Sequence, residues 1–245
     1  KPVVMSRYYY DLHVHSCLSP CGDNDNTPNN LVGMAVLNGL QIMALTDHNT
    51  CRNCPGFFQA AKKHGIIPIA GMELTTAEDI HIIFLFENLE DAMGFDKEIE
   101  TRRILFPNRV DIYGEQYVMD GEDNVLATEP NLLSNATTVT VEECPALAEK
   151  FCGICYPAHV DRQANGIIST LGTFPDIKGF KCCEFHDGDN IDEYLGKYPI
   201  GNRKIIVSSD AHFLWDMRDE NRYFLIDDEP YSSELVRRRI FEALR

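Results

Sequence analysis

The sequence predicts an α/β fold in which strands and helices alternate around a closed or nearly closed barrel. Short apolar runs recur along the 245 residues, and most are followed by a segment whose apolar residues have helical spacing. Metal-binding residue types follow several of these runs directly, at the position where barrel strands lead into catalytic loops. With 44% hydrophobic residues the chain is long enough for one large core, so we expect a single domain over residues 1–245.

The first predicted strand, residues 8–15, has the two-residue period of a half-buried strand. This period places His13 and His15 on one side of the strand, near its end, where two imidazoles can bind one metal ion. Residues 19–22 then read as a loop, and Asp23 and Asp25 supply two further oxygen donors.

The next strands each end in donor residues as well. Thr27 and Pro28 are typical of a helix start, and a second helix is predicted over residues 55–64. The apolar runs 41–45 and 66–70 are predicted strands, and they lead into Asp47-His48 and into Glu73 respectively. A further buried strand is predicted within residues 79–86, with His81 near its beginning.

Residues 88–140 interrupt the rhythm of strands and helices. Residues 90–103 have helical spacing, and the Asp-Gly pair at 120–121 predicts a hairpin between residues 113–118 and 124–128. We interpret 88–140 as an insertion or lid over the mouth of the barrel.

The rhythm resumes after residue 140. Thr140 and Glu143 form a capping-box pattern that predicts a helix to residue 151, and residues 232–245 are predicted to form a terminal helix. Four more strands are predicted at 153–156, 180–185, 204–207 and 223–226. The first three lead to His159, to His186 and to Asp210-Ala-His212.

Charge and composition exclude several classes of partner. A formal net charge of −16 disfavours stable binding of duplex nucleic acid, because phosphate contacts come mainly from Lys and Arg. No apolar run is long enough to cross a bilayer and no signal-peptide pattern is present, so we expect a cytoplasmic protein without membrane contact. The nine cysteines are predicted to be buried thiols rather than disulfides, although Cys17, Cys21, Cys51 and Cys54 have spacings that a zinc or iron–sulfur site can use.

Six short motifs, in order from residue 11 to residue 212, resemble those of the PHP (polymerase and histidinol phosphatase) family. They are Asp11-Leu-His13-Val-His15-Ser, Leu-Thr-Asp47-His48-Asn, Gly-Met-Glu73, Asp79-Ile-His81, Pro-Ala-His159 and Ser-Ser-Asp210-Ala-His212. The resemblance implies a distorted (β/α)7 TIM-like barrel that holds three metal ions at its C-terminal face, with the insertion at about 88–140.

The resemblance also implies a distribution of ligands. His13, His15, Glu73 and Asp210 would hold the first metal; Glu73, His81 and His159 the second; and His48 and His212 the third, together with a residue of the first loop. An acidic residue commonly follows the second serine of the first motif, but here Pro20 follows Ser19. We therefore expect Asp23, displaced along the loop, to supply the missing ligand, with Asp25 as second choice.

The expected chemistry is hydrolysis of a small phosphomonoester or nucleotide by a metal-activated hydroxide at a trinuclear site. Clustered cations acidify a bridging water and neutralise phosphoryl oxygens, and mixed imidazole and carboxylate ligands suit two or three Zn, Mn or Fe(II) ions. Glu73, Asp47 and His212 are the expected catalytic residues, Asp47 being either a partner of a ligand, a proton carrier or a structural cap. Arg162 and His186 are candidates for contact with the phosphorylated substrate.

Three other functions stay open from sequence. An amidohydrolase-type metal hydrolase also begins with His-x-His, but it leaves Glu73 and the Asp47-His48 pair without a role. An exonuclease acting on short oligonucleotides is compatible with the motifs, although the charge counts against long polymers. A non-catalytic, metal-binding regulatory module would follow if the displaced first-loop acid left the metal site incomplete.

Overall fold

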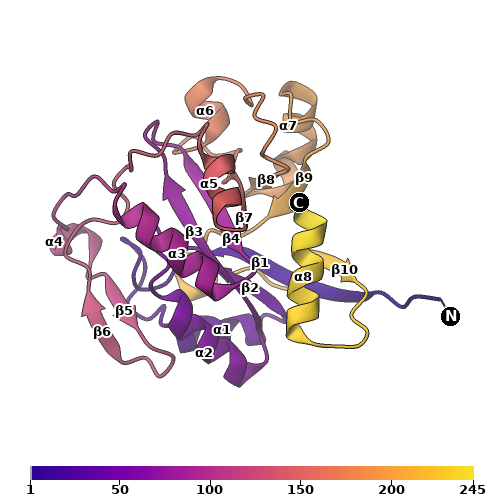
Figure 1. The fold of residues 1–245 in the computed structure, drawn as a ribbon, viewed down its shortest axis with the longest axis horizontal. Coiled ribbons are helices and arrows are strands. Elements are labelled where there is room, and N and C mark those ends of the chain that lie inside the picture. Colours follow the sequence, from indigo (N-terminus) through magenta and orange to yellow (C-terminus); the bar gives the residue numbers. More distant parts are fainter. Residues whose placement is uncertain (1) are drawn as a thin grey trace.

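A computed structural model describes residues 2–245, and its centre is a curled sheet of mixed strand direction (Figure 1). The strands are β1 (Ser6–Val14), β2 (Ile42–Leu45), β3 (Ile67–Thr75), β4 (His81–Phe86), β5 (Tyr117–Met119), β6 (Val125–Thr128), β7 (Gly153–Pro157), β8 (Cys182–Phe185), β9 (Lys204–Val207) and β10 (Tyr223–Ile226). The helices are α1 (Pro28–Leu37), α2 (Cys54–His64), α3 (Leu89–Glu100), α4 (Val110–Tyr113), α5 (Cys144–Lys150), α6 (Ile167–Leu171), α7 (Ile191–Lys197) and α8 (Ser233–Leu244), with 3-10 turns η1 (Gly188–Asn190) and η2 (Leu214–Asp216).

The main sheet has the order β10-β1-β2-β3-β4-β7, and not all of its strands are parallel. Strands β1, β2 and β3 are parallel, whereas β4 is antiparallel to both β3 and β7. The prediction of a parallel sheet is therefore wrong at β4. Only residues 76–80 join β3 to β4, and this is too short for the crossover that parallel strands need, so the two strands form a hairpin.

The ring of strands is not closed by continuous ladders. Strands β8 and β9 form a separate parallel pair. At one seam the Val160 amide donates to the Glu184 carbonyl (2.8 Å), and at the other the His15 amide donates to the Ala211 carbonyl (2.9 Å). The structure thus confirms a mixed α/β fold with a curled, half-barrel sheet, whereas it does not form the closed (β/α)7 barrel that was predicted.

The helices begin and end where local chemistry favours it. The Thr27 hydroxyl accepts the Asn30 amide at the start of α1, and Ser232 caps α8 in the same way. Helix α2 ends at Gly65, whose φ of 73° lies in the left-handed region. Helix α3 packs Phe95 against Phe84 and Phe86, with ring centroids 4.6 and 4.9 Å apart. Each buried aromatic ring contributes about 1.5–3 kcal/mol.

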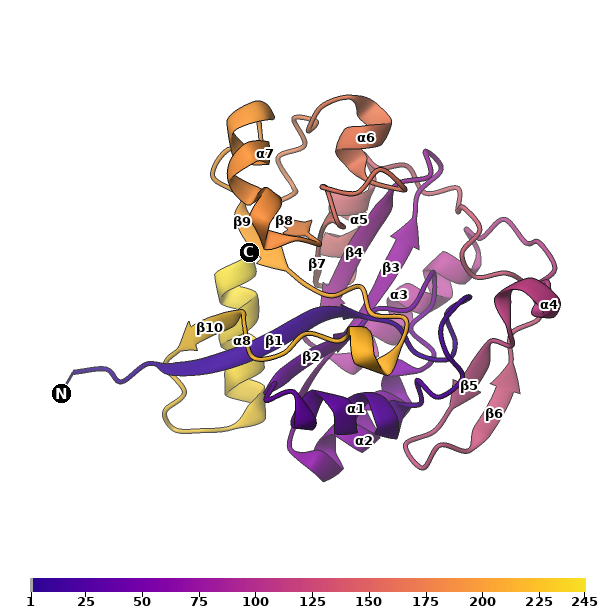
Figure 2. The same cartoon turned by 180° about the vertical axis from the view of Figure 1, so that it is seen from behind.

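The segment that interrupts the fold is shorter than the predicted 88–140. Helix α3 belongs to the core, because Ala92, Phe95 and Ile99 are fully buried against the sheet. Residues 101–140, called the insertion from here on, leave the sheet and include α4 and the predicted hairpin, β5–β6 (Figures 1 and 2). Their last residues return to the sheet, where Val139 is buried in the main core. The insertion rests on the loop after β1, since the Tyr117 amide donates to the Cys17 carbonyl (3.2 Å).

The structure bears on the expectations about membrane-spanning segments and about the cysteines. In the part of the chain that is described, none of the helices combines the length and apolar character that crossing a membrane requires. All nine cysteines are free thiols; Cys17, Cys51 and Cys54 are buried and Cys21 is exposed. Cys152 is exposed as well, so the prediction of buried thiols is wrong at these two positions and holds for the other seven. None of the donor groups found within residues 2–245 includes a cysteine, and packing accounts for the buried thiols.

Candidate metal centre

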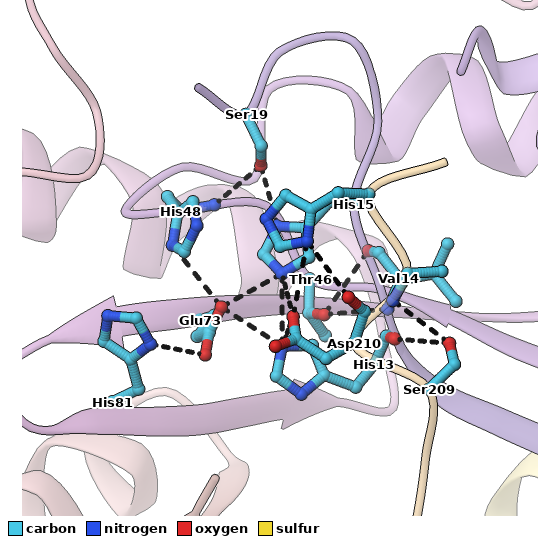
Figure 3. Close-up of polar contacts among 12 residues, drawn as sticks. His13, Val14, His15, Ser19, Thr46, His48, Glu73, His81, Ser209 and Asp210 are labelled. Carbon is cyan, nitrogen blue, oxygen red and sulfur yellow. Dashed lines mark hydrogen bonds and ion pairs between the residues drawn. The ribbon is translucent and has the colours of Figure 1, made fainter. Parts of the chain in front are cut away.

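Four donor atoms from three parts of the chain meet at one point inside the curled sheet (Figure 3). The Nε2 atoms of His13 and His15 lie 3.1 Å apart. Glu73 Oε2 is 3.1 Å from the first and 3.0 Å from the second, and Asp210 Oδ1 lies at the same two distances. All four residues are at most 9% exposed. They are the four ligands expected for the first metal.

The ends of the strands bring these donors together. His13 and His15 follow the period of β1, and the His48–Glu73 bridge joins the ends of β2 and β3. Asp210 and His159 have φ values of 55° and 26°, a region that non-glycine residues rarely adopt. Backbone strain of this kind concentrates at functional sites, where the surrounding structure enforces it.

Hydrogen bonds on the far side of each ring fix the tautomers of His13 and His15. His13 Nδ1 donates to Glu184 Oε1 (2.8 Å), since a carboxylate only accepts. The Ser19 hydroxyl donates to Asp47 Oδ1 (2.7 Å) and therefore accepts from His15 Nδ1 (2.8 Å). In the neutral form of each ring the unprotonated nitrogen is thus Nε2, which faces the carboxylates, and this is the arrangement of metal-ligating histidines. Without a metal ion the same position takes a proton, as the raised pKa values of both rings indicate.

Two further groups adjoin the first. Glu73 Oε1 lies 2.8 Å from His81 Nδ1 and 3.1 Å from His159 Nε2, so the Glu73 carboxylate faces donors on both sides. The third group joins His48 and His212 to His15. His212 Nδ1 donates to the Asp210 carbonyl (3.0 Å), which leaves its Nε2 as a lone pair. The histidines predicted for the second and third ions therefore lie beside the first group.

The electrostatics of the cluster favour a cation. Burial alone would lower the pKa of His13, but the carboxylates of Glu184, Glu73 and Asp210 raise it well above its usual value. Burial likewise opposes protonation of His15, while Asp210 and Glu73 raise its pKa to about 9. For His212 the balance is reversed. Burial and the positive charge of His15 outweigh the carboxylates of Asp210 and Glu73, and they lower the pKa of His212 to about 4. The field that raises the first two values attracts a metal ion as well as a proton.

The donors present fit metal ions. Glu73 Oε2, His48 Nδ1 and His159 Nδ1 are buried without a hydrogen-bond partner among the described residues, and buried polar atoms rarely stay unpartnered unless a ligand, ion or water binds them. Imidazole and carboxylate donors in such mixed groups suit Zn, Mn or Fe(II). The cluster therefore agrees with metal dependence, while the identity and number of the ions stay predictions.

Asp23 is the predicted metal ligand that the structure does not bring to the cluster. Asp23 Oδ1 accepts the Asp25 amide (2.8 Å) in a local turn, and neither carboxylate belongs to any donor group in the described chain. The Asp23 backbone does reach the site, because its amide donates to the His212 carbonyl (3.0 Å). The Asp23 side chain instead accepts a hydrogen bond within the loop, and the third donor that groups with His48 and His212 is His15.

Asp47 lies behind the ligands rather than among them. Its carboxylate accepts the Ser16 amide and both the Ser16 and Ser19 hydroxyls, each at 2.7 Å. Of the three roles considered from sequence, the geometry fits a partner that orients His15 through Ser19.

Sequence reasoning missed Glu184 as a functional residue. The side chain is buried, and its Oε1 also accepts the His159 amide (3.0 Å), so it holds two predicted ligands at once. Its only sequence signal is a charged residue inside an otherwise apolar strand, which by itself does not indicate a partner.

Two cavities flank the cluster. The first, called the insertion cleft, has a volume of about 730 Å³ and lies between His48, His81 and His212 on one side and Tyr113 and Asn135 of the insertion on the other. The second, called the arginine cavity, has a volume of about 300 Å³ and touches Asp210. It is lined by Arg162, His186, Ser209, Asp210, Asp216 and Arg218.

Both predicted substrate residues lie in the arginine cavity. Arg162 Nη1 donates to Asp210 Oδ2 (2.6 Å), and its Nη2 donates to His186 Nε2 (3.4 Å). Arg218 donates to the His186 carbonyl. Burial and these two guanidinium groups lower the pKa of His186, so the imidazole is neutral between two cations.

The chain is similar in sequence to several known proteins. Residues 11–126 match the family model described as PHP domain, and this agrees with the resemblance found from the motifs. An uncharacterized protein of Methanocaldococcus jannaschii is 30% identical over 99 residues, which are 37% of this chain and 58% of that protein. A 5'-3' exoribonuclease of Haemophilus influenzae is 31% identical over 130 residues, which are 52% of this chain and 43% of the enzyme. The chain thus spans about half the length of these relatives.

Solved structures share the fold across nearly the whole chain. A lesion-specific endonuclease of Pyrococcus furiosus has a TM-score of 0.64 and 18% identity, covering 95% of this chain and 55% of its own. A proposed metal-dependent phosphoesterase of Bifidobacterium adolescentis has a TM-score of 0.59 and 17% identity, covering 96% of both chains. These likenesses establish the fold.

Proposed function

Proceeding from the PHP domain that the chain carries, we propose that this protein is a metal-dependent hydrolase that cleaves phosphoester bonds. The observation that carries the proposal is the convergence of His13, His15, Glu73 and Asp210, whose donor atoms all lie within 4.8 Å of one another, with the Nε2 atom of each imidazole 3.0–3.1 Å from both carboxylates. Bound divalent cations at this point would acidify water and neutralise phosphoryl oxygens.

The residues of the chain have distinct tasks in this proposal. Glu73 would bridge neighbouring ions, because its two oxygens face different histidines. His13 and His15 would be held in the ligating tautomer by Glu184 and by the Asp47–Ser19 pair. His212 donates its Nδ1–H to the Asp210 carbonyl, so its Nε2 would serve as a metal ligand at the edge of the insertion cleft.

The arginine cavity supports an anionic substrate. The Arg162 guanidinium pairs with Asp210 Oδ2, the carboxylate oxygen that does not face His13 and His15, and it lines the arginine cavity beside this expected metal ligand. Arg218 and the neutral His186 add donors around the same space, and His186 Nδ1 is buried without a partner in the described structure. Guanidinium groups recognise phosphate through paired hydrogen bonds. We therefore assign Arg162, His186 and Arg218 to binding of the phosphorylated substrate.

The first candidate substrate is a small phosphomonoester or nucleotide. The net charge of −16 supports it, since a long polyanion would be repelled beyond the arginine cavity. The second candidate is an oligonucleotide end, which the likeness to an exoribonuclease over 130 residues favours. The expectation that stable duplex nucleic acid is not a partner stays a prediction.

A substrate comparison with added Mn or Zn tests the proposal. Phosphate release from p-nitrophenyl phosphate and a panel of phosphomonoesters would support the first candidate. Faster cleavage of a short 5'-phosphorylated oligonucleotide, or of bis(p-nitrophenyl) phosphate, would favour the second. If no phosphoester were cleaved with either metal, a metal-binding regulatory role or an amidohydrolase-type reaction would replace both.

A further inference from the structure

The chain that follows His212 carries two stacked aromatic side chains at the edge of the site. The rings of Phe213 and Trp215 lie 4.9 Å apart with an interplanar angle of 16°. Trp215 is 73% exposed, and it is the only tryptophan of the sequence. Within residues 2–245 no other ring packs against it. The indole therefore presents one flat aromatic face to solvent, which a planar ligand can cover.

The segment that holds this pair is fixed in place. In η2 the Asp216 amide donates to the Phe213 carbonyl (3.1 Å). Directly after η2, Met217 is buried in the main core and the Arg218 amide donates to Asp11 Oδ2 (3.1 Å). Since Asp11 is fully buried in β1, the aromatic pair is anchored to the strand that carries His13 and His15.

The aromatic pair adjoins the arginine cavity. Trp215 lines an open hollow of about 640 Å³, and two of its other lining residues, Asp216 and Arg218, also line the arginine cavity. The two spaces therefore adjoin each other: Asp210 lines one, Trp215 lines the other, and Arg218 lines both.

We propose that Trp215, supported by Phe213, is a stacking platform for the base of a nucleotide whose phosphate group lies at the metal centre and arginine cavity. This proposal rests on the phosphoesterase function and narrows its substrate to a nucleotide or to the terminal nucleotide of a strand. Every nucleobase has a flat face that stacks on an aromatic side chain, so the platform does not require one particular base.

The charges around the hollow agree with a base rather than with further phosphates. Asp216, Asp219 and Glu220 line it together with Trp215. Carboxylates accept hydrogen bonds from the amino groups of bases, whereas they repel phosphate oxygens. Asp216 and Arg218 line both spaces, whereas Arg162 lines only the arginine cavity and Asp219 and Glu220 line only the hollow at the indole. The balance of charge therefore shifts from basic to acidic towards the indole, which matches a phosphate followed by a base.

The single tryptophan makes the proposal directly measurable. Protein loaded with Mn or Zn is mixed with adenosine 5'-monophosphate (AMP) or with ribose 5-phosphate in a stopped-flow instrument, and the initial change in tryptophan fluorescence, before phosphate is released, is recorded over a range of concentrations. We expect saturable quenching by AMP and none by ribose 5-phosphate at the same concentrations. A free tryptophan amide in the same AMP solutions corrects for absorption by adenine. Absence of saturable quenching by AMP, or equal quenching by both compounds, would overturn the platform.

Variants of the metal-loaded enzyme supply the second readout. Trp215→Ala is expected to lower the ratio of kcat/KM for AMP to that for ribose 5-phosphate by about 5- to 100-fold, mainly through KM. Trp215→Phe should restore most of the ratio, because phenylalanine keeps a flat ring. Tyr231→Ala is the matched control, since Tyr231 is 61% exposed and lies in the distant loop before α8.

The two proposals fail in different ways. If neither compound releases phosphate, the phosphoesterase function is overturned while the fluorescence titration still decides on base stacking. If both are hydrolysed and Trp215→Ala leaves the ratio unchanged, the platform is overturned while the phosphoesterase function stands.

Discussion

The two sides of the metal centre differ in charge and in the part of the chain that builds them. The arginine cavity is formed by the ends of β7, β8 and β9 and presents Arg162 and Arg218 beside Asp210. The insertion cleft is closed by residues 113–136; none of its lining residues is Lys or Arg, and Glu78 and Asp79 are among them. Among the residues that line the two cavities, Arg therefore occurs only in the arginine cavity, where Arg162 follows β7 and Arg218 follows η2.

For the phosphoester substrate that we propose, this difference would set a direction. Anionic groups are attracted to the arginine cavity, where guanidinium groups are fixed by Asp210 and His186. The insertion cleft is better suited to water and to uncharged parts of a substrate, and its walls from the insertion shield the open faces of His48 and His212. Glu73 stands between the sides, in contact with histidines of both (Figure 3).

The largest effect is expected from Glu73→Gln, because this carboxylate contacts histidines on both sides of the metal centre. The glutamine keeps the shape but removes the negative charge that lies 2.8–3.1 Å from His13, His15, His81 and His159. We expect activity on phosphoesters to fall by at least about 10³-fold, since even partners behind a ligand matter 10- to 100-fold. Elemental analysis should show fewer bound ions per chain. A variant with wild-type activity and metal content would remove Glu73 from the centre of the site.

A smaller effect is expected from Glu184→Gln, which acts on the arginine side through His13 and His159. The amide can present its NH₂ group to His13 Nδ1 and so favour the wrong tautomer. We expect metal affinity, measured by competition with a chelator, to fall about 10- to 100-fold. Glu193→Gln, an exposed change in α7, is the matched control. Equal affinities for the two variants would mean that Glu184 only fills space.

The next smaller effect is expected from substitutions that compare the two cavities directly. Arg218→Ala is expected to raise KM for an anionic phosphoester about 5- to 50-fold with a smaller change in kcat, because a charge-assisted contact is lost. Ser134→Ala in the wall of the insertion cleft should change KM less than about twofold. Thermal melting of both variants shows whether the fold is kept. A larger effect at Ser134 than at Arg218 would reverse the assigned direction of the substrate.

The donors were predictable from sequence because they follow apolar strands. His13, His48, Glu73 and Asp210 each mark a strand end, and the C-terminal ends of neighbouring strands meet at one edge of a sheet. Strand β9 and the edge strand β10 were also predicted with their observed bounds. Patterns of this kind depend only on local periodicity.

Features that depend on contacts between distant segments were not predictable. The reversal of β4 follows from the short connection at 76–80, which an apolar run does not reveal. Glu184 acquires its role only when β8 closes against β7 and β1, 171 residues away from His13 in sequence. The core position of α3 is likewise set by Phe84 and Phe86 rather than by the helix itself.

The smallest effect is expected from Asp23→Ala, the change that sequence reasoning had placed at a metal ligand. In the structure the carboxylate only accepts the Asp25 amide, while the contact to His212 is made by the backbone and survives the substitution. We expect an unchanged metal count and a loss of about 0.5–1 kcal/mol in stability from the missing hydrogen bond. His212→Ala is the comparison, and it should lower the metal count, because its imidazole groups with His15 and His48. Loss of an ion from Asp23→Ala alone would mean that the first loop turns its acid inward when metal binds, as the displaced motif had suggested.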